Sequence, residues 1–541
     1  MLIRSLLKTF TYYNVYLIME KILHPMEKLT PSYTYMQQYV LNCDLQFPLI
    51  AYRPVPVNCK PVDSNGNELI GAKLTQFYTS LFQSVQDCGF NIVTIPTGSA
   101  ENNRILTLGV LSSLKFIPYL ESFKNLLNPD SPKYFNEKTK SDIDEELGIY
   151  ESNDKIWAIE IYDEPKAAIW QNVASGTSPD SETCNLKNVY DYVATKVNSW
   201  GGTKKYVFFN IAATTDKSVI GNIATNNGTT SFSKESLYYR YLKELQTTFA
   251  PQIWSYAYYP IISDPFWESD NTTLVVPDVK SEYYGYLTDL ARISSESSRP
   301  LLAYVLCTPH YWYDGKGNAP ENIRAAYPSP TVEHLRFQAF TAIAFGAKGL
   351  VFWNYGQGEY KIEKFPMPES DAVYTDAAIN VNGVKTSIWN MLKTVLTDIK
   401  QSSNLFLQST LLKVQSFTNG TSSVLLNRSN GADDAPDFKL KGDKFSVLAS
   451  SFKVGIGLTS SKFLESHLIL LVNKEIDKSQ NFSISIKNGN YKYSLITPDT
   501  VNGNPATMIG LSDGQSYTKY QISIAAGGYA LIKVSPKATT P

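Results

Sequence analysis

The sequence predicts a (β/α)8 TIM barrel followed by a C-terminal all-β sandwich domain. Eight apolar, strand-like runs alternate with amphipathic helical stretches, and parallel strands need one crossover helix each. After about residue 405 the helical periodicity disappears and short strands follow one another. An open, doubly wound sheet is the alternative, but no Gly-rich phosphate turn follows any strand. The barrel is therefore the favoured fold, and nucleotide binding is not expected.

The elements of the barrel follow one another in strand–helix pairs. The strands are predicted at 47–55, 91–96, 115–120, 156–165, 205–213, 252–261, 300–309 and 349–356. The helices are predicted at 74–89, 101–114, 136–150, 186–200, 235–249, 281–297, 331–347 and 387–402. Eight further strand-like segments, separated by Asn, Gly, Asp and Ser turns, indicate a small sandwich after the barrel. We expect three parts: an N-terminal extension at 1–46, the barrel at 47–405 and the sandwich at 406–541.

Composition narrows the range of partners. Lys and Arg number 49 against 50 Asp and Glu, so the net charge of −1 offers no basic surface for nucleic acid. No stretch reaches about 18 apolar residues, so no membrane span is expected. The five cysteines and four histidines are scattered, which argues against a zinc cluster or a metal-dependent hydrolase. The N-terminus shows no clear signal-peptide cleavage site, and the oligomeric state stays open.

The fourth predicted strand, IWAIEIYDEP, carries the most informative residues, because a barrel builds its active site at the carboxyl ends of its strands. Strict alternation predicts Trp157, Ile159 and Ile161 on the helix side, and Ala158, Glu160, Tyr162 and Glu164 on the interior side. Glu164 would then stand at the mouth, with Glu160 deeper and Arg53, at the end of the first strand, as a candidate partner. A Glu in this position suits a general acid with a raised pKa, although it could instead brace a loop or pair with Arg53.

The motif Asp163-Glu164-Pro165 resembles the Asn-Glu-Pro that ends the fourth strand in many (β/α)8 glycoside hydrolases. The segment LRFQAFTAIAFGAKGLVFWNYG (335–356) is similar to the corresponding segment of family 42-type β-galactosidases, and the trailing β-domain fits their layout. The resemblance implies cleavage of a glycosidic bond in an oligo- or polysaccharide, with Glu164 as the acid and no metal or organic cofactor. A periplasmic or extracellular location would follow if the substrate is a polysaccharide.

The sequence departs from this family at the seventh strand. The resemblance implies a nucleophilic Glu at its end, but LLAYVLCTPHYWYDG offers no carboxylate before Asp314. Asp264, Glu359 and Asp314 are the candidates for the second catalytic group, and a distant one would suit an inverting reaction. The alternative function is a noncatalytic carbohydrate-binding or degenerate barrel that has lost this nucleophile.

Polar and aromatic side chains near the strand ends predict a sugar-binding groove, because aromatic rings stack on the apolar faces of sugars. Each ring could instead merely fill the barrel. His310 and Cys307 are expected on opposite faces, so Cys/His catalysis is not favoured, and no GxSxG motif is present. The predicted substrate-binding residues are Arg53, Glu160, Tyr162, Asn210, Tyr258, Tyr259, His310, Trp312, Trp353 and Tyr355.

Overall fold

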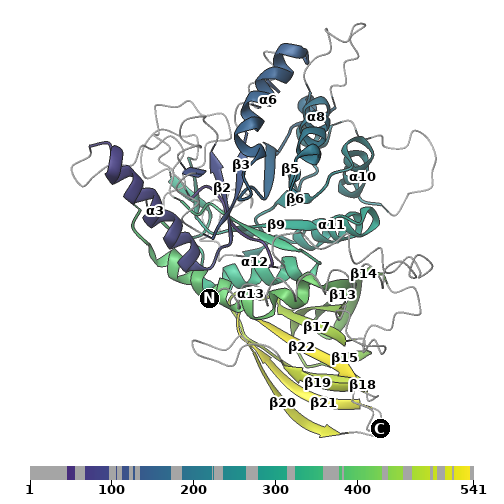
Figure 1. Ribbon diagram of the computed structural model, residues 1–541. Coiled ribbons are helices and arrows are strands. Elements are labelled where there is room, and N and C mark those ends of the chain that lie inside the picture. Colours follow the sequence, from purple (N-terminus) through teal and green to yellow (C-terminus); the bar gives the residue numbers. More distant parts are fainter. Residues whose placement is uncertain are drawn as a thin grey trace, which may run out of the picture.

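Figure 1 shows the computed structural model, with the barrel above and the C-terminal sheets below. The structure describes residues 46–54, 67–96, 105–106, 113–120, 123, 126–127, 134–171, 185–221, 223, 235–262, 278–313, 323–356, 377–380, 383–428, 437–454, 466–487, 491–495, 506–513 and 517–536. The predicted N-terminal extension lies almost wholly outside these residues, and the predicted helix at 101–114 mostly so.

Eight parallel strands close into a barrel in the order β1-β2-β3-β4-β5-β6-β9-β12, with β12 pairing back to β1. The predicted TIM barrel is therefore confirmed. The strands are β1 (Leu49–Ala51), β2 (Ile92–Pro96), β3 (Lys115–Tyr119), β4 (Ala158–Asp163), β5 (Tyr206–Ala212), β6 (Trp254–Ala257), β9 (Leu301–Leu306) and β12 (Gly349–Trp353). Two short ribbons, β7 (Ile261–Ile262) with β8 (Asp278–Val279) and β10 (His310–Tyr313) with β11 (Ile323–Tyr327), lie outside the barrel sheet.

The helices start where the sequence supplies polar caps. Asn136, Asn185, Ser236 and Thr331 each accept a hydrogen bond from the backbone N–H three residues further on, which satisfies a donor that the first turn leaves unpaired. Within the described part of the chain, none of the helices has the length and hydropathy needed to span a membrane. They are α3 (Gly71–Cys88), α6 (Glu137–Glu151), α7 (Ala167–Trp170), α8 (Leu186–Ser199), α9 (Lys217–Ile220), α10 (Leu237–Phe249), α11 (Tyr283–Ser297), α12 (Val332–Ala344) and α13 (Ser387–Leu407).

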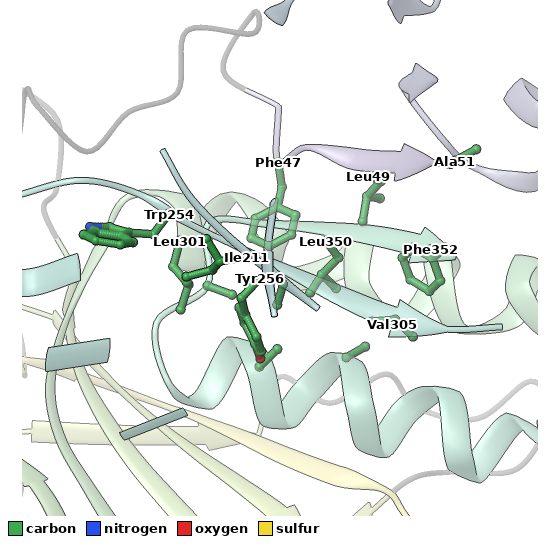
Figure 2. Packing of buried hydrophobic residues seen from close by; sticks show 14 of the residues in the cluster. Phe47, Leu49, Ala51, Ile211, Trp254, Tyr256, Leu301, Val305, Leu350 and Phe352 are labelled. Atoms are coloured by element: carbon green, nitrogen blue, oxygen red, sulfur yellow. The ribbon is translucent and has the colours of Figure 1, made fainter. Parts of the chain in front are cut away.

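Two apolar layers hold the barrel together. The outer layer lies between strands and helices, and Figure 2 shows part of it, with Leu350, Phe352 and Val305 from neighbouring strands close together. The inner layer fills the barrel itself and includes Tyr52 and Tyr304. Alternate residues of the strands supply the two layers, as expected for parallel strands buried on both faces.

The C-terminal part is a sandwich of two antiparallel sheets, which confirms the predicted second fold element. One sheet has the order β14-β13-β16-β17-β22-β19 and the other β15-β18-β21-β20. Two of the ten strands, β15 and β20, lie outside the eight predicted strand-like segments. The strands are β13 (Ser409–Thr418), β14 (Thr421–Asn427), β15 (Phe438–Lys441), β16 (Ser446–Val454), β17 (Ser466–Asn473), β18 (Gln480–Lys487), β19 (Tyr491–Leu495), β20 (Ala506–Asp513), β21 (Tyr517–Ile524) and β22 (Tyr529–Pro536).

Helices α12 and α13 lie between the barrel strands and the six-stranded sheet (Figure 1). Along β17, Leu468 and Leu470 join the apolar cluster of these helices, whereas Ile469 faces the second sheet. The rings of Phe340 in α12 and Tyr529 in β22 stack with centroids 3.5 Å apart. The central strands of the six-stranded sheet, β16 and β17, are thus buried on both faces, and the apolar core of the barrel helices continues onto this sheet. The division at residue 405 stays a prediction.

Candidate active site

A β-bulge changes the direction of the side chains at the end of β4. Glu160 lies opposite Phe208 of β5, but Asp163 lies opposite Asn210, so three steps along β4 match two along β5. The additional residue shifts the alternation. Tyr162 packs against the outer apolar cluster, so its predicted place in the barrel interior is wrong. Asp163 takes the inward position instead.

The other end of β4 also departs from strict alternation. Trp157, predicted on the helix side, belongs to the interior cluster, where its ring lies 5.7 Å from that of Tyr206. Ala158, Ile159 and Ile161 lie on the predicted sides. Alternation therefore holds only in the middle of the strand.

Asp163 is held by a chain of hydrogen bonds across three neighbouring strands. The Asn210 amide nitrogen Nδ2 donates to Asp163 Oδ1 at 2.9 Å, and Ser255 Oγ donates to Asn210 Oδ1 at 3.1 Å. Because the hydroxyl of Ser255 donates to the amide oxygen, the amide nitrogen faces Asp163. Asn210 is 1% exposed, which corrects the prediction that its amide holds a substrate hydroxyl. It positions Asp163.

Glu164 stands at the tip of β4 in the left-handed backbone region, with φ of 51°. Its backbone N–H donates to the carbonyl oxygen of Asn210 at 2.9 Å, which fixes the turn. The residue is exposed, yet burial, and then the negative charge of Asp163, raise the pKa of its carboxyl to about 8. Part of the residue is thus in contact with water, while the surrounding protein disfavours the charged form of its carboxyl. Non-glycine residues in this backbone region are concentrated at functional sites.

Glu160, four residues before Glu164 on the same strand, is fully buried, at 0% exposure. Tyr304 donates a hydrogen bond from its hydroxyl to Glu160 Oε1 at 3.4 Å, and the Tyr304 ring lies 5.6 Å from that of Tyr52. Burial, and then the charge of Glu160, raise the pKa of both tyrosines well above the ordinary value. Asp163 adds to both shifts, in keeping with its inward position. The predicted contact of Glu160 with a substrate is therefore wrong, because protein covers it completely.

Arg53 follows β1 and shares the mouth with the β4 tip. Its φ of 47° is also left-handed, and its backbone N–H donates to Thr94 Oγ1 at 2.7 Å. The guanidinium carbon lies 5.2 Å from the ring centre of Tyr52 and 5.1 Å from that of Tyr119. These cation–π distances place a positive charge over two aromatic faces at the end of the first strand. Its role toward a substrate stays a prediction.

Two of the predicted aromatic residues form one wall at the carboxyl ends of β6 and β12. The rings of Tyr259 and Trp353 stack, with centroids 5.7 Å apart and an angle of 30°, and both pack against the interior cluster. The ring of Tyr327, the last residue of β11, meets Tyr259 edge-on at 5.9 Å. Burial raises the pKa of Tyr327 to about 12, and the charge of Glu164 adds to the shift. Tyr327 was missed in the sequence because it lies in a hairpin after the seventh strand.

Two other predicted aromatic residues face away from the opening, which corrects their assignment. Tyr258 stacks on Tyr283 of α11 at 5.8 Å and donates a hydrogen bond to Glu282 Oε1. Tyr355 is 0% exposed and packs edge-on against Phe90 at 5.3 Å, within the outer layer. Alternation after β6 and β12 fails here because both segments have already left the sheet.

The seventh barrel strand, β9, ends at Leu306 without a carboxylate. The next two residues, Cys307 and Thr308, are both buried. His310 and Trp312 belong to the ribbon β10, where the backbone of His310 pairs with Tyr327, and their side chains lie outside the described residues. The three candidates for the second catalytic group also lie outside the described residues: Asp264, Asp314 and Glu359.

Sequence reasoning missed the two residues that organise this mouth. Asp163 was noted only as the Asp in place of the usual Asn before Glu164, and that replacement was its one signal. Ser255 carried no signal, because its role depends on the register between β5 and β6, in which it lies opposite Asn210.

No protein-family model matches this chain, and no curated protein matches it. Several solved structures are similar to it at low identity. The maltogenic α-amylase from Thermotoga neapolitana has 8% identity and a TM-score of 0.39, with 90% of this chain and 96% of that chain covered. The endo-1,4-β-xylanase from Caldicellulosiruptor owensensis has 10% identity and a TM-score of 0.35, with 66% and 98% covered. An endo-α-mannosidase from Bacteroides thetaiotaomicron has 10% identity and a TM-score of 0.34, with 64% and 85% covered.

Such low identities and TM-scores carry no argument about chemistry. The resemblance to family 42-type β-galactosidases stays a prediction, and function has to be argued from the residues at the mouth.

Proposed function

We propose that this protein hydrolyses glycosidic bonds at the mouth of its barrel, with Glu164 as the proton donor. One observation carries the proposal: the carboxyl of Glu164 is exposed at a strand tip, and its pKa is raised to about 8. Such a group still holds its proton at neutral pH and can give it to the leaving oxygen of a glycoside. Glycoside cleavage is a reaction in which a protonated carboxyl and a nearby carboxylate suffice.

The surroundings of Glu164 support a sugar as the ligand. Tyr259 and Trp353 offer a stacked aromatic wall near the opening, suited to the apolar face of a pyranose ring. Arg53 and Asp163 add a positive and a negative group able to bond hydroxyls. No metal or organic cofactor is required by this chemistry. An extracellular or periplasmic location, for a polysaccharide substrate, belongs to the same proposal.

A second candidate function rests on the tip of β9. Because this tip carries no carboxylate, the barrel could bind a carbohydrate without cleaving it. Asp264, Asp314 and Glu359 remain the loop carboxylates that would support a two-carboxylate mechanism.

The substitution Glu164→Gln tests the proposal. A panel of aryl glycosides and polysaccharides first identifies a substrate of the full-length protein. We expect Glu164→Gln to lower kcat by about 10²- to 10⁴-fold on that substrate, because the amide has no acidic proton to transfer. The matched control is Glu145→Gln, an exposed glutamate of α6 on the outside of the barrel. Hydrolysis by Glu164→Gln at the unaltered rate would remove Glu164 from the mechanism, and sugar binding without hydrolysis by the unmodified protein would favour the second candidate.

A further inference from the structure

A buried lysine, Lys348, lies directly before β12, at the end of the barrel opposite the mouth. It is 5% exposed, and its ammonium donates hydrogen bonds to the carbonyl oxygens of Phe406, at 2.6 Å, and of Ser409. A longer contact of 3.5 Å reaches the carbonyl oxygen of Leu407. Phe406 and Leu407 form the end of α13, and Ser409 begins β13. Lys348 therefore caps the last barrel helix at the point where the chain enters the sandwich.

A second positive charge, that of Arg428, lies near Lys348. Arg428 follows β14, and its Nη1 donates a hydrogen bond to the carbonyl oxygen of Leu411 at 3.3 Å. Burial of Lys348, and then the positive charge of Arg428, lower the pKa of the lysine to about 7. In the part of the chain that the structure describes, no carboxylate lies within 4.0 Å of either cation. The two like charges are thus held near each other without an acidic partner.

Lys348 and Arg428 line one small cavity between the barrel and the sandwich. Its volume is about 20 Å³, enough for one particle of about the size of water. Residues of α11, of the turn between α12 and β12, and of β13 complete the wall. Ser294, Ser295 and Thr410 are among them, and the described lining residues include no Asp or Glu. The cavity therefore combines positive charge with hydroxyl groups at a place where both parts of the molecule meet.

The charges around this cavity are unbalanced. The carbonyl groups at the end of a helix carry about half a negative charge, and Lys348 already lies against those of α13. When both side chains are protonated, Lys348 and Arg428 contribute two full positive charges. An uncompensated charge in a protein interior is strongly destabilising. A negatively charged particle in the cavity would offset much of this excess.

We propose that a chloride ion binds in this cavity, between Lys348 and Arg428, and holds the sandwich against the barrel. The small volume suits a single-atom anion and leaves no room for a phosphate or a carboxylate group. A guanidinium has five N–H donors, so Arg428 can bind the ion directly while Nη1 keeps its bond to Leu411. Lys348 attracts the ion through its charge, since its own N–H groups already meet carbonyl oxygens. The site lies at the far end of the barrel from Glu164, so it is independent of the function proposed above.

Thermal unfolding of the full-length protein tests the proposal without any variant. Sodium chloride replaces sodium gluconate at constant ionic strength, so that general screening of charges stays the same. A ligand that binds the folded protein alone stabilises it increasingly as its concentration exceeds Kd. We expect Tm to rise by about 2 °C between about 1 mM and 100 mM chloride. Crystals grown with sodium bromide should show an anomalous scattering peak between Lys348 and Arg428.

The variant Arg428→Gln removes one of the two charges and keeps a hydrogen-bond donor. We expect it to lose the rise of Tm with chloride. Lys441→Gln, at an exposed cation of β15, is the matched control and should keep the full rise. Equal Tm in chloride and gluconate would overturn the proposal, as would a chloride effect that Arg428→Gln retains. Bromide peaks found only elsewhere on the molecule would also overturn it, and this outcome can be read even if Arg428→Gln does not fold.

Discussion

At the scale of single residues, the proposed chemistry rests on Glu164 and its neighbour Asp163. Glu164 is exposed at the strand tip, yet burial of its carboxyl and the adjacent negative charge of Asp163 oppose its ionisation. These conditions favour the protonated form. The proposed acid therefore keeps its proton at neutral pH, and the dipeptide Asp163-Glu164 that carries it is visible in the sequence.

The pH dependence of the reaction follows from the raised pKa of Glu164, at about 8. As pH rises through that value the carboxyl loses the proton that it must donate, so activity falls. We expect kcat/KM on an aryl glycoside with a poor leaving group to drop about tenfold per pH unit above this pKa. The measurement is a pH–rate profile of the unmodified protein.

Substrates with an activated leaving group provide the control for that profile. A 2,4-dinitrophenyl glycoside needs little help from an acid, so its alkaline decline should be weaker. A profile that begins to fall on the alkaline side near pH 5 for both substrates would show that Glu164 titrates as an ordinary carboxyl and would contradict the assignment.

At the scale of elements, the strand β4 marks the limit of what could be predicted from the sequence. Alternation correctly assigns Ala158 and Glu160 to the interior and Ile159 to the helix side. It fails from Tyr162 onward, because a bulge depends on the register with β5, and the sequence of one strand does not show its register with a partner. The bulge turns the Asp163 side chain inward, where the amide of Asn210 donates a hydrogen bond to it.

The hydrogen-bond chain from Ser255 through Asn210 to Asp163 can be tested link by link. Asn210→Ala should lower kcat by about 100-fold, because Asp163 loses its fixed position, and should destabilise the fold by about 1–3 kcal/mol. Ser255→Ala should have a smaller effect on both, since the amide keeps its bond to Asp163. Steady-state kinetics and urea unfolding measure the two quantities. A larger loss of activity in Ser255→Ala than in Asn210→Ala would contradict the proposed role of these hydrogen bonds in positioning Asp163.

At the scale of the whole molecule, periodicity predicted the barrel and the sandwich but not how they join. The eight strand–helix repeats could be predicted from the sequence, because each repeat has its own apolar periodicity. The strands β15 and β20 were missed because they are short or weakly apolar, as FKLK and ATMIGLSD show. The contact between α12 and β22 left no signal, because apolar residues of a helix that is buried all round do not reveal which partner covers each side.

The close approach of the sandwich to α12 can be tested at Gly527, in the turn before β22. Its φ is +55°, and a Cβ added there would lie 2.3 Å from the backbone oxygen of Glu333. The matched control is Gly420, with φ of +80° and nothing within 4 Å of an added Cβ. We expect Gly420→Ala to cost about 1–2 kcal/mol from backbone strain alone. Gly527→Ala should cost at least about 1–3 kcal/mol more, because the turn must move away from the helix.

Urea unfolding of both variants gives this difference directly. Equal losses of stability in Gly527→Ala and Gly420→Ala would show that the turn does not rest on α12. A single unfolding transition of the Gly420→Ala variant would also agree with an apolar core that the barrel and the sandwich share.

The burial of the six-stranded sheet limits how the C-terminal sandwich can be transferred to another protein. Its strand β17 meets helices on one side and strands on the other, so no row of its side chains is left to water. A sandwich moved onto another scaffold without α12 and α13 would present a bare hydrocarbon surface and aggregate. A crossover between this protein and another barrel should therefore lie before α12. The segment from α12 through β12 to α13 then stays in one chain with the C-terminal sheets.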